Sequence, residues 1–448
     1  MPSSNAFDRL WMPFTCYRDT VDYPPVVIDR GSGVYVYDKA GRELIDGVGS
    51  WWVSIFGHCH PHITAAVKNQ LDKIEHILMA GFISEPALRL SHLLGDLLPK
   101  ELTRIFYSDD GSTAVEVALK IALQYHALRG NAACEFVGLG SGYHGDTLGA
   151  MSVSNIPAYH SLFHERFKKH HSVDSPYCYR CPKGKQPLTC SAECMDSLEA
   201  VFKERHDKIA ACIFEPMVQG AAGMRVYPAK VLKRIFSLCE QYDILTIADE
   251  VAVGFGRTGK LFACEHAGKT PDIICLAKGL TGGYLPMGAT AVKEHIFEEF
   301  KGGPGSDRIL FHGHSFTGNP LAAAAACASM ELIREFDIPA SLDKSISSFK
   351  KGLESFREYA VVGDVRSIGL IGAIEFVKDK KTKDPFPASD RFAFTIARKA
   401  LEHGLLVRPL GDVLYFIPAF IITGEQIDAM FSILHRSIKD ILNARPAH

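Results

Sequence analysis

Two charged residues, Asp249 and Lys278, each follow a short apolar run of the chain. Residues 244–248 read ILTIA and residues 273–277 read IICLA, and both runs are typical of strands buried on both faces. Because α/β proteins bind ligands beyond the carboxyl ends of such strands, we expect both side chains in one crevice. A lysine that forms a Schiff base and a carboxylate that keeps a pyridine nitrogen protonated are the groups that pyridoxal phosphate requires.

Neither residue is diagnostic by itself, since a lysine after a strand is usually a solvated surface residue and Asp249 could be a loop acid. The surrounding sequence is more specific. DEVAVGFGRTGK at 249–260 and AKGLTGGYLP at 277–286 resemble the signature of the class III aminotransferases, enzymes of pyridoxal-phosphate fold type I. The resemblance extends over nearly the whole chain. It implies that Asp249 pairs with the pyridine nitrogen and that Lys278 carries the aldehyde of the cofactor.

A candidate phosphate site lies in residues 103–120, TRIFYSDDGSTAVEVALK. A strand-like run leads through a Ser-Asp-Asp-Gly turn to a helical pattern that starts near Ser112. The N-terminus of such a helix offers free backbone N–H groups and a favourable dipole to an anion. The alternative is an ordinary helix N-cap at Ser112. The family resemblance implies that Gly111 and Ser112 bind the cofactor phosphate.

The segment GYHGDT at 142–147 resembles the family segment that covers the cofactor ring. The resemblance implies that Tyr143 stacks on the ring and belongs to the catalytic residues. The alternative is a packed turn, because an aromatic residue beside glycines is common in turns. We expect Asp146 close by as a second carboxylate, paired with Arg257.

Residues 309–320, ILFHGHSFTGNP, resemble the family segment that crosses a dimer interface to the phosphate bound by the partner subunit. Ser315 stands at the position of the phosphate-binding hydroxyl, and Gly313 is a candidate substrate contact beside it. The resemblance therefore implies a homodimer with shared active sites, which a single sequence does not demonstrate.

Several short motifs resemble the branch of the family that aminates 8-amino-7-oxononanoate during biotin biosynthesis. They are WMPF at 11–14, the tryptophan pair at 51–52, GYHGDT, and VRPLGD at 407–412. In this branch Trp51 and Trp52 would supply apolar walls for the substrate's methylene chain, and Arg408 would bind its carboxylate. Both tryptophans could instead be core residues. Ala221 stands where glutamate-using relatives carry a glutamate, which argues against such substrates.

The amino donor is open between S-adenosylmethionine and lysine. The commoner donor in this branch is S-adenosylmethionine, and its users usually carry a tyrosine where this chain has Phe14. The missing hydroxyl removes one possible hydrogen bond worth about 0.5–1.5 kcal/mol, which is too little to exclude that donor. The segment HGHSFTGNP is closer to the lysine-using minority. We take S-adenosylmethionine as the expected donor.

The resemblance implies an α/β fold of the pyridoxal-phosphate-dependent transferase type I. Its large domain is built on a mostly parallel central sheet, and a smaller α/β domain follows at the carboxyl end. We expect an amino-terminal arm and small-domain segment over 1–60, the large domain over 61–337 and the small domain over 338–448. Residues 174–197 form an insertion within the large domain.

The insertion carries Cys178, Cys181, Cys190 and Cys194 in a C-x2-C…C-x3-C arrangement that resembles a structural metal knuckle. Free thiols are the alternative, because this spacing does not show that the four sulfur atoms converge. No metal is expected at the catalytic centre.

A formal net charge of -2 over 448 residues gives no sign of nucleic-acid or membrane binding. No apolar run approaches the ~20 residues of a membrane helix, and the first residues, MPSSNAFDRLWMPF, lack a secretory pattern. We therefore expect a cytoplasmic enzyme that acts on small molecules. The competing hypotheses are another class III ω-aminotransferase and a non-catalytic metal-knuckle module on the same fold.

Overall fold

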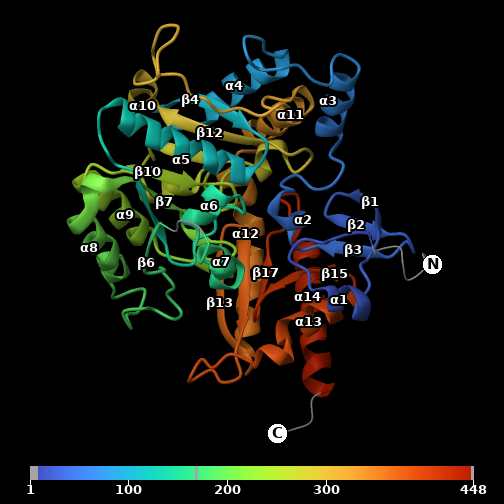
Figure 1. Cartoon of the computed structure of the whole chain (residues 1–448). Helices are drawn as coiled ribbons and strands as arrows, with labels where there is room; N and C mark the ends of the chain where they lie inside the picture. Colours follow the sequence, from blue (N-terminus) through green and yellow to red (C-terminus); the bar gives the residue numbers. More distant parts are fainter. Residues whose placement is uncertain (1–8, 167–169, 445–448) are drawn as a thin grey trace.

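The computed structural model describes residues 9–166 and 170–444, and its central element is a seven-stranded sheet (Figure 1). From edge to edge its strands are β4 (Leu102–Ser108), β12 (Gly288–Lys293), β11 (Ile273–Leu276), β10 (Leu245–Asp249), β7 (Ile209–Phe214), β5 (Glu135–Leu139) and β6 (His171–Val173). Strand β12 pairs antiparallel with both of its neighbours, and the other pairs are parallel. The predicted α/β fold with a mostly parallel central sheet is confirmed.

Both faces of this sheet are covered, which explains why its strands are continuous apolar runs. On β10, Ile247 joins the hydrophobic cluster beneath α5 (Gly111–Leu128), whereas Ala248 joins a cluster on the opposite face. The helices on that opposite face are α8 (Asp196–Arg205), α9 (Ala229–Gln241), α4 (Glu85–Leu97) and α11 (Pro320–Phe336). The sheet is thus the middle layer of three.

Two further four-stranded sheets stand apart from the central sheet in Figure 1, the first to its right and the second below it. One has the order β1 (Ile28–Ser32), β2 (Tyr35–Asp38), β3 (Glu43–Asp46) and β15 (Leu405–Leu406); the other has the order β13 (Val362–Ile368), β14 (Ile371–Phe376), β17 (Val413–Phe416) and β16 (Arg408–Leu410). Because β3 pairs in parallel with β15, a segment near the start of the chain and a segment near its end lie in the same sheet. The domain boundaries at 60 and 337 stay a prediction.

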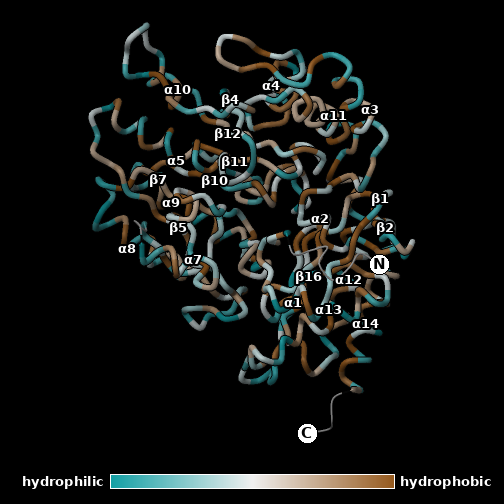
Figure 2. Tube along the Cα trace, turned by 45° about the vertical axis from the view of Figure 1, so that its right-hand side comes forward, coloured by the Kyte–Doolittle hydropathy of each residue, from teal (hydrophilic) through white to brown (hydrophobic). Residues whose placement is uncertain are grey.

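Of the three carboxyl-terminal helices, α12 (Ile338–Glu354) and α13 (Phe392–Glu402) both pack on α14 (Gly424–Ala444), and Figure 2 shows hydrophobic segments in this region. The remaining helices are α1 (Tyr17–Asp22), α2 (Gly49–Trp52), α3 (Pro61–Leu71), α6 (Leu148–Val153), α7 (Pro157–His164) and α10 (Glu294–Glu298). A short hairpin joins β8 (Val218–Gln219) to β9 (Arg225–Val226). Among the described helices, none has the length and apolar character needed to cross a membrane.

Candidate active site

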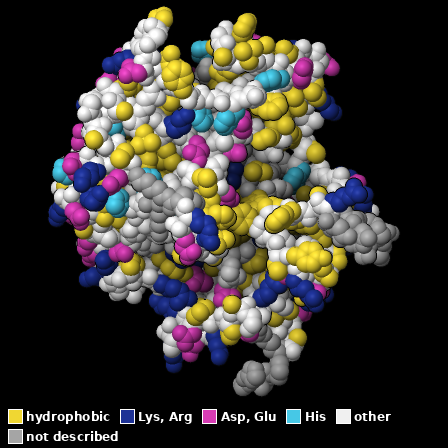
Figure 3. Space-filling view, in the orientation of Figure 1, with side chains coloured by type: hydrophobic (Ala, Val, Ile, Leu, Met, Phe, Trp, Pro, Cys, Tyr) yellow, Lys and Arg dark blue, Asp and Glu magenta, His cyan; other side chains and the backbone are white. Residues whose placement is uncertain are grey.

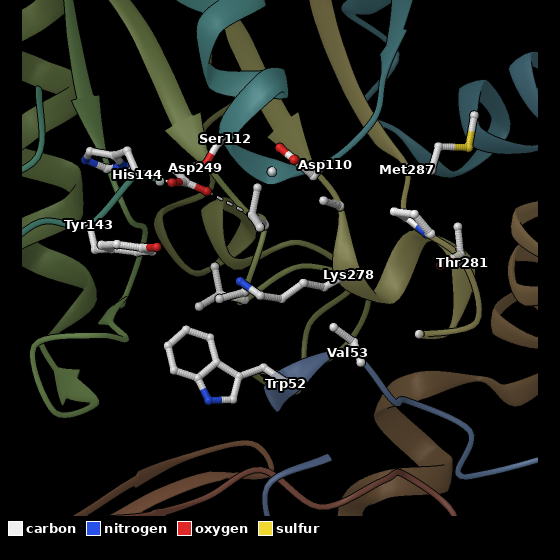
Figure 4. A pocket seen from close by; sticks show the side chains of 18 of the residues that line it. Trp52, Val53, Asp110, Ser112, Tyr143, His144, Asp249, Lys278, Thr281 and Met287 are labelled. Atoms are coloured by element: carbon white, nitrogen blue, oxygen red, sulfur yellow. Dashed lines mark hydrogen bonds and ion pairs between the residues drawn. The ribbon is translucent and has the colours of Figure 1, made fainter. Parts of the chain in front are cut away.

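The carboxyl ends of β7, β10 and β11 open into a cavity of about 420 Å³, which Figure 4 shows from close by. Six residues of the predicted site line it: Trp52, Gly111, Ser112, Tyr143, Asp249 and Lys278. His144 and Glu215, which the sequence did not assign to the site, line it too. The fold therefore collects side chains that lie up to about 226 residues apart in the chain.

Lys278 begins a short 3-10 helix, Lys278–Thr281, one residue after the end of β11, and its backbone is left-handed with φ of 47°. A non-glycine residue in this region is strained, and such strain is concentrated at functional sites. The side chain crosses the cavity, and its Nζ lies 4.8 Å from the centre of the Trp52 ring (Figure 4). Burial lowers the pKa of the Lys278 amine, against the opposing charges of Asp249 and Glu215. The amine is therefore more easily neutral, as a nucleophile must be.

Asp249 is the last residue of β10, and a hydrogen bond holds its carboxylate against His144. The distance from Oδ2 of Asp249 to Nδ1 of His144 is 2.8 Å, and Oδ1 accepts the N–H of Val251 at 3.1 Å. An ionised carboxylate only accepts hydrogen bonds, so the His144 tautomer that satisfies it carries its proton on Nδ1. His144 thus orients the carboxylate. Its place inside GYHGDT was the only sequence signal for it.

Helix α5 begins at Gly111, but the residue that caps it is Asp110. Oδ1 of Asp110 accepts the N–H of Thr113 at 2.8 Å, and the Thr113 hydroxyl accepts the N–H of Asp110 at 2.9 Å. The alternative prediction of an N-cap at Ser112 is wrong, because Ser112 lies inside the first turn. Its Oγ accepts the N–H of Asp146 at 3.1 Å and lines the cavity. The helix N-terminus and a hydroxyl are thus both available to an anion.

Tyr143 lines the cavity, and its hydroxyl donates to Oδ2 of Asp146 at 2.7 Å. The predicted pairing of Asp146 with Arg257 is wrong. Nε2 of His160 lies 3.9 Å from Oδ1 of Asp146, whereas Arg257 donates to the carbonyls of Pro418 at 2.5 Å and Ser54 at 2.6 Å. Burial lowers the pKa of Arg257 to about 9. Arg257 therefore joins distant segments of chain.

Trp51 and Trp52 adopt left-handed backbone conformations, with φ of 69° and 77°. Their indole side chains lie in different surroundings. Trp52 is buried and lines the cavity. Trp51 is 38% exposed, and the guanidinium of Arg408 lies over its ring at 4.1 Å. Phe14 meets the Trp51 ring edge-on at 5.8 Å. Trp51 and Arg408 thus form a group outside the cavity lining.

Gly313 and Ser315 do not line the cavity of the single chain, and both are exposed. Their segment is held against α5 and the turn before it. Nδ1 of His314 lies 2.7 Å from Oδ2 of Asp109 in that turn, and the Lys120 amine of α5 donates to the carbonyl of Phe311 at 2.8 Å. The roles predicted for both residues stay predictions.

The four cysteines of the insertion, Cys178, Cys181, Cys190 and Cys194, line one small cavity of about 20 Å³. All four are free thiols, and burial raises the pKa of Cys178 to about 11 and that of Cys194 to about 12. Within residues 9–166 and 170–444, no group of three or more His, Cys, Asp or Glu side chains is arranged to hold a metal ion. The metal knuckle is not formed in this structure.

The chemistry of the cavity fits pyridoxal phosphate. Lys278 offers an amine to the aldehyde, Asp249 a carboxylate to the pyridine nitrogen, and the start of α5 an anion site. Backbone crowding supports the fit: a Cβ at Gly111 would lie 2.6 Å from Cγ1 of Val251, so only glycine leaves this corner open. Tyr143 supplies an aromatic surface for a flat ring.

Comparison with known proteins gives the class. The class III aminotransferase family matches residues 16–438, and the chain belongs to this family. Enzymes of this class depend on pyridoxal phosphate, and they include an amine transaminase from an uncultivated Pseudomonas species, solved in its PLP-bound form, at TM-score 0.92 and 35% identity. That match covers 97% of this chain and 99% of the other.

Among its relatives the chain is similar to adenosylmethionine-8-amino-7-oxononanoate aminotransferases. The protein of that name from Geobacter sulfurreducens is 41% identical over 435 residues, which is 97% of this chain and 96% of the relative. The crystal structure of the Methanocaldococcus jannaschii protein of that name superposes with a TM-score of 0.91 at 37% identity and covers 97% of both chains. These matches confirm the predicted family and its fold type.

Lys278→Ala is expected to abolish transamination and the covalent fixation of the cofactor by borohydride, because no other lysine lines the cavity of the described chain. The measurement is peptide mass spectrometry after borohydride reduction. The matched control is Lys301→Ala, since Lys301 is exposed and pairs with Glu298 at the surface. Normal turnover by Lys278→Ala would show that the lysine has been assigned wrongly.

Proposed function

We propose that this protein transfers an amino group to 8-amino-7-oxononanoate, giving 7,8-diaminononanoate for biotin biosynthesis, with S-adenosylmethionine as donor. The observation that carries the proposal is the arrangement of Trp52, Trp51 and Arg408 from the cavity outward. Relatives named for this reaction match nearly the full chain. The alternatives are the same reaction with lysine as donor and another class III ω-aminotransferase.

The substrate has an apolar chain of methylene groups that ends in a carboxylate. Apolar walls with a few polar anchors are typical of small-molecule sites. Trp52 provides an apolar wall in the cavity, and outside the cavity lining the Arg408 guanidinium lies over the Trp51 ring and suits a carboxylate. At Ala221 the side chain is a methyl group, so it offers no carboxylate to compete for that guanidinium.

Pyridoxal phosphate, when bound, supplies the electron sink that allows an amine to be exchanged for a ketone. Asp249, held by His144 at 2.8 Å, places a negative charge where the ring nitrogen needs one. The Lys278 amine, with its lowered pKa, can take up and return the proton that moves between two carbon atoms. Gly111 and Ser112 hold the phosphate, and Tyr143 covers the ring.

A homodimer with shared sites is part of the proposal. Large hydrophobic side chains are exposed near the segment of Ser315, and they include Leu78, Phe82, Phe311 and Phe316. Figure 3 shows hydrophobic side chains gathered toward the top of this face, over the region of α3, α4 and α11. Exposed large hydrophobic side chains that gather on one face are typical of a protein interface. A second copy seated there would bring Ser315 and Gly313 to its neighbour's cavity.

The proposed compartment is the cytoplasm. All twelve cysteines are free thiols, as is typical of proteins in a reducing compartment. The proposed partners are small molecules, namely the keto acid and the amino donor.

The donor is tested in a half-reaction without keto acid. Purified enzyme is mixed with S-adenosylmethionine or with lysine, and the decrease of the cofactor's visible absorbance is followed. We expect conversion by S-adenosylmethionine, followed by 7,8-diaminononanoate in the mass spectrum once 8-amino-7-oxononanoate is added. Conversion by lysine alone would replace the donor but keep the reaction. If neither donor led to that product, the proposed substrate would be wrong.

Arg408→Ala is expected to lower kcat/KM for 8-amino-7-oxononanoate by about 10- to 100-fold, mainly through KM, because a charge-assisted hydrogen bond contributes about 1.5–3 kcal/mol. Steady-state kinetics with varied keto acid measure this. Arg408→Lys keeps the charge and should recover part of the loss. Arg436→Ala, which changes an exposed arginine on α14, is the control. An unchanged KM in Arg408→Ala would remove the carboxylate anchor from the proposal.

Mixing two inactive variants tests the shared site. In a mixed dimer of Lys278→Ala and Ser315→Asp, one of the two sites combines an intact Lys278 with an intact Ser315 from the other subunit. Random exchange makes half of the dimers mixed, so about a quarter of wild-type activity is expected. No recovery after exchange is confirmed by mass spectrometry would contradict sharing.

A further inference from the structure

Glu215 is a buried carboxyl group in the cavity that the chemistry described above does not use. It follows β7 directly, its residue is 6% exposed, and it lines the cavity together with Asp249 and Lys278. A carboxylate is rarely buried without a partner, because transfer out of water is costly. Its partners are therefore informative.

The two carboxylate oxygens of Glu215 bind two different walls of the cavity. Oε2 accepts the N–H of Tyr143 at 3.0 Å, and Oε1 accepts the N–H of Gly220 at 2.8 Å. Tyr143 carries the aromatic surface of the site. Gly220 lies against Trp52, since a Cβ built on it would be 3.2 Å from Cζ3 of the indole. One side chain thus fixes the spacing between the Tyr143 wall and the Trp52 wall.

The charged groups around Glu215 connect it to the amine of Lys278. Burial and the negative charge of Asp249 raise the pKa of Glu215 to about 7, against the opposing effects of His144 and the two N–H donors. The negative charge of Glu215 in turn raises the pKa of Lys278. A further titratable neighbour is Tyr227, whose hydroxyl donates to the backbone carbonyl of Glu215 at 2.6 Å. The carboxylate and the amine therefore influence each other's protonation.

We propose that Glu215 is a positioning residue of the aminotransferase site: it joins the Tyr143 and Trp52 walls, and its charge sets the proton affinity of Lys278. The proposal rests on the proposed role of Lys278 as the cofactor-binding lysine. Removal of the negative charge destabilises the protonated nitrogen of Lys278, so the midpoint of its titration moves to lower pH.

The experiment is a pH titration of the visible absorbance of the holoenzyme, compared between wild type and Glu215→Gln. The midpoint of the cofactor band is expected to fall by about one pH unit in the variant, which is tenfold in proton affinity. Well below pH 7 the two titrations coincide, because Glu215 is already neutral there. Identical midpoints would overturn the proposal.

Glu250→Gln is the matched control. Glu250 is fully buried, its pKa is also raised to about 7 by burial, and its oxygens accept the N–H groups of Ala263 at 2.7 Å and Cys264 at 2.8 Å. It does not line the cavity. Its variant should therefore leave the absorbance midpoint unchanged, and an equal shift in both variants would also overturn the proposal.

A second measurement applies if Glu215→Gln does not fold. Infrared difference spectra of the Glu250→Gln holoenzyme between pH 6 and pH 8 should retain a band from a buried carboxylic acid, which Glu215 supplies. Absence of that band would contradict the proposal. If the Lys278→Ala variant kept the visible band of the wild-type enzyme, the proposed function itself would be refuted. The two failures are therefore distinguishable.

Discussion

The parallel pairing of β10 with β11 is the constraint on which the active site depends. Ile247 pairs with Ile273 and Asp249 with Cys275, so the two strands end side by side and release Asp249 and Lys278 at the same edge. The register is fixed by apolar side chains on both faces, because a shift by one residue would turn each of them to the wrong layer. Packing far from any substrate therefore sets the separation of the two charged groups.

Removal of water from that edge favours the neutral forms of two ionisable groups of the cavity, Lys278 and Glu215. Burial lowers the pKa of the Lys278 amine and raises that of the Glu215 carboxyl, so both are driven toward their neutral forms. Asp249 accepts hydrogen bonds from His144 and from the Val251 N–H. Burial thus shifts the protonation of Lys278 and Glu215, whereas hydrogen bonds orient the carboxylates of Asp249 and Glu215.

The sequence predicted those parts of the site that depend on neighbours in the chain. Asp249 and Lys278 follow recognisable buried strands, and the glycine at 111 marks the start of a helix. Contacts between distant segments were not predictable in this way. The sequence predicts a pair of Arg257 with Asp146, but Arg257 donates to the backbone carbonyls of Pro418 and Ser54. Every residue has such a carbonyl, so the sequence does not indicate which ones are bound. Glu215 carries no local sequence signal of this kind, because its contacts are N–H groups from two other segments.

The parallel pair formed by β3 and β15 has a consequence for how the protein is made. The N–H of Gly47 donates to the carbonyl of Leu406 at 3.0 Å, and the N–H of Ile417 donates to the carbonyl of Gly47 at 2.8 Å. At ~5–20 residues per second, the ribosome needs roughly 20–70 s to add the roughly 360 residues between these partners. The segment that holds Gly47 and Trp52 therefore cannot form these hydrogen bonds until synthesis is nearly complete. The nascent chain must be kept from aggregating during that interval.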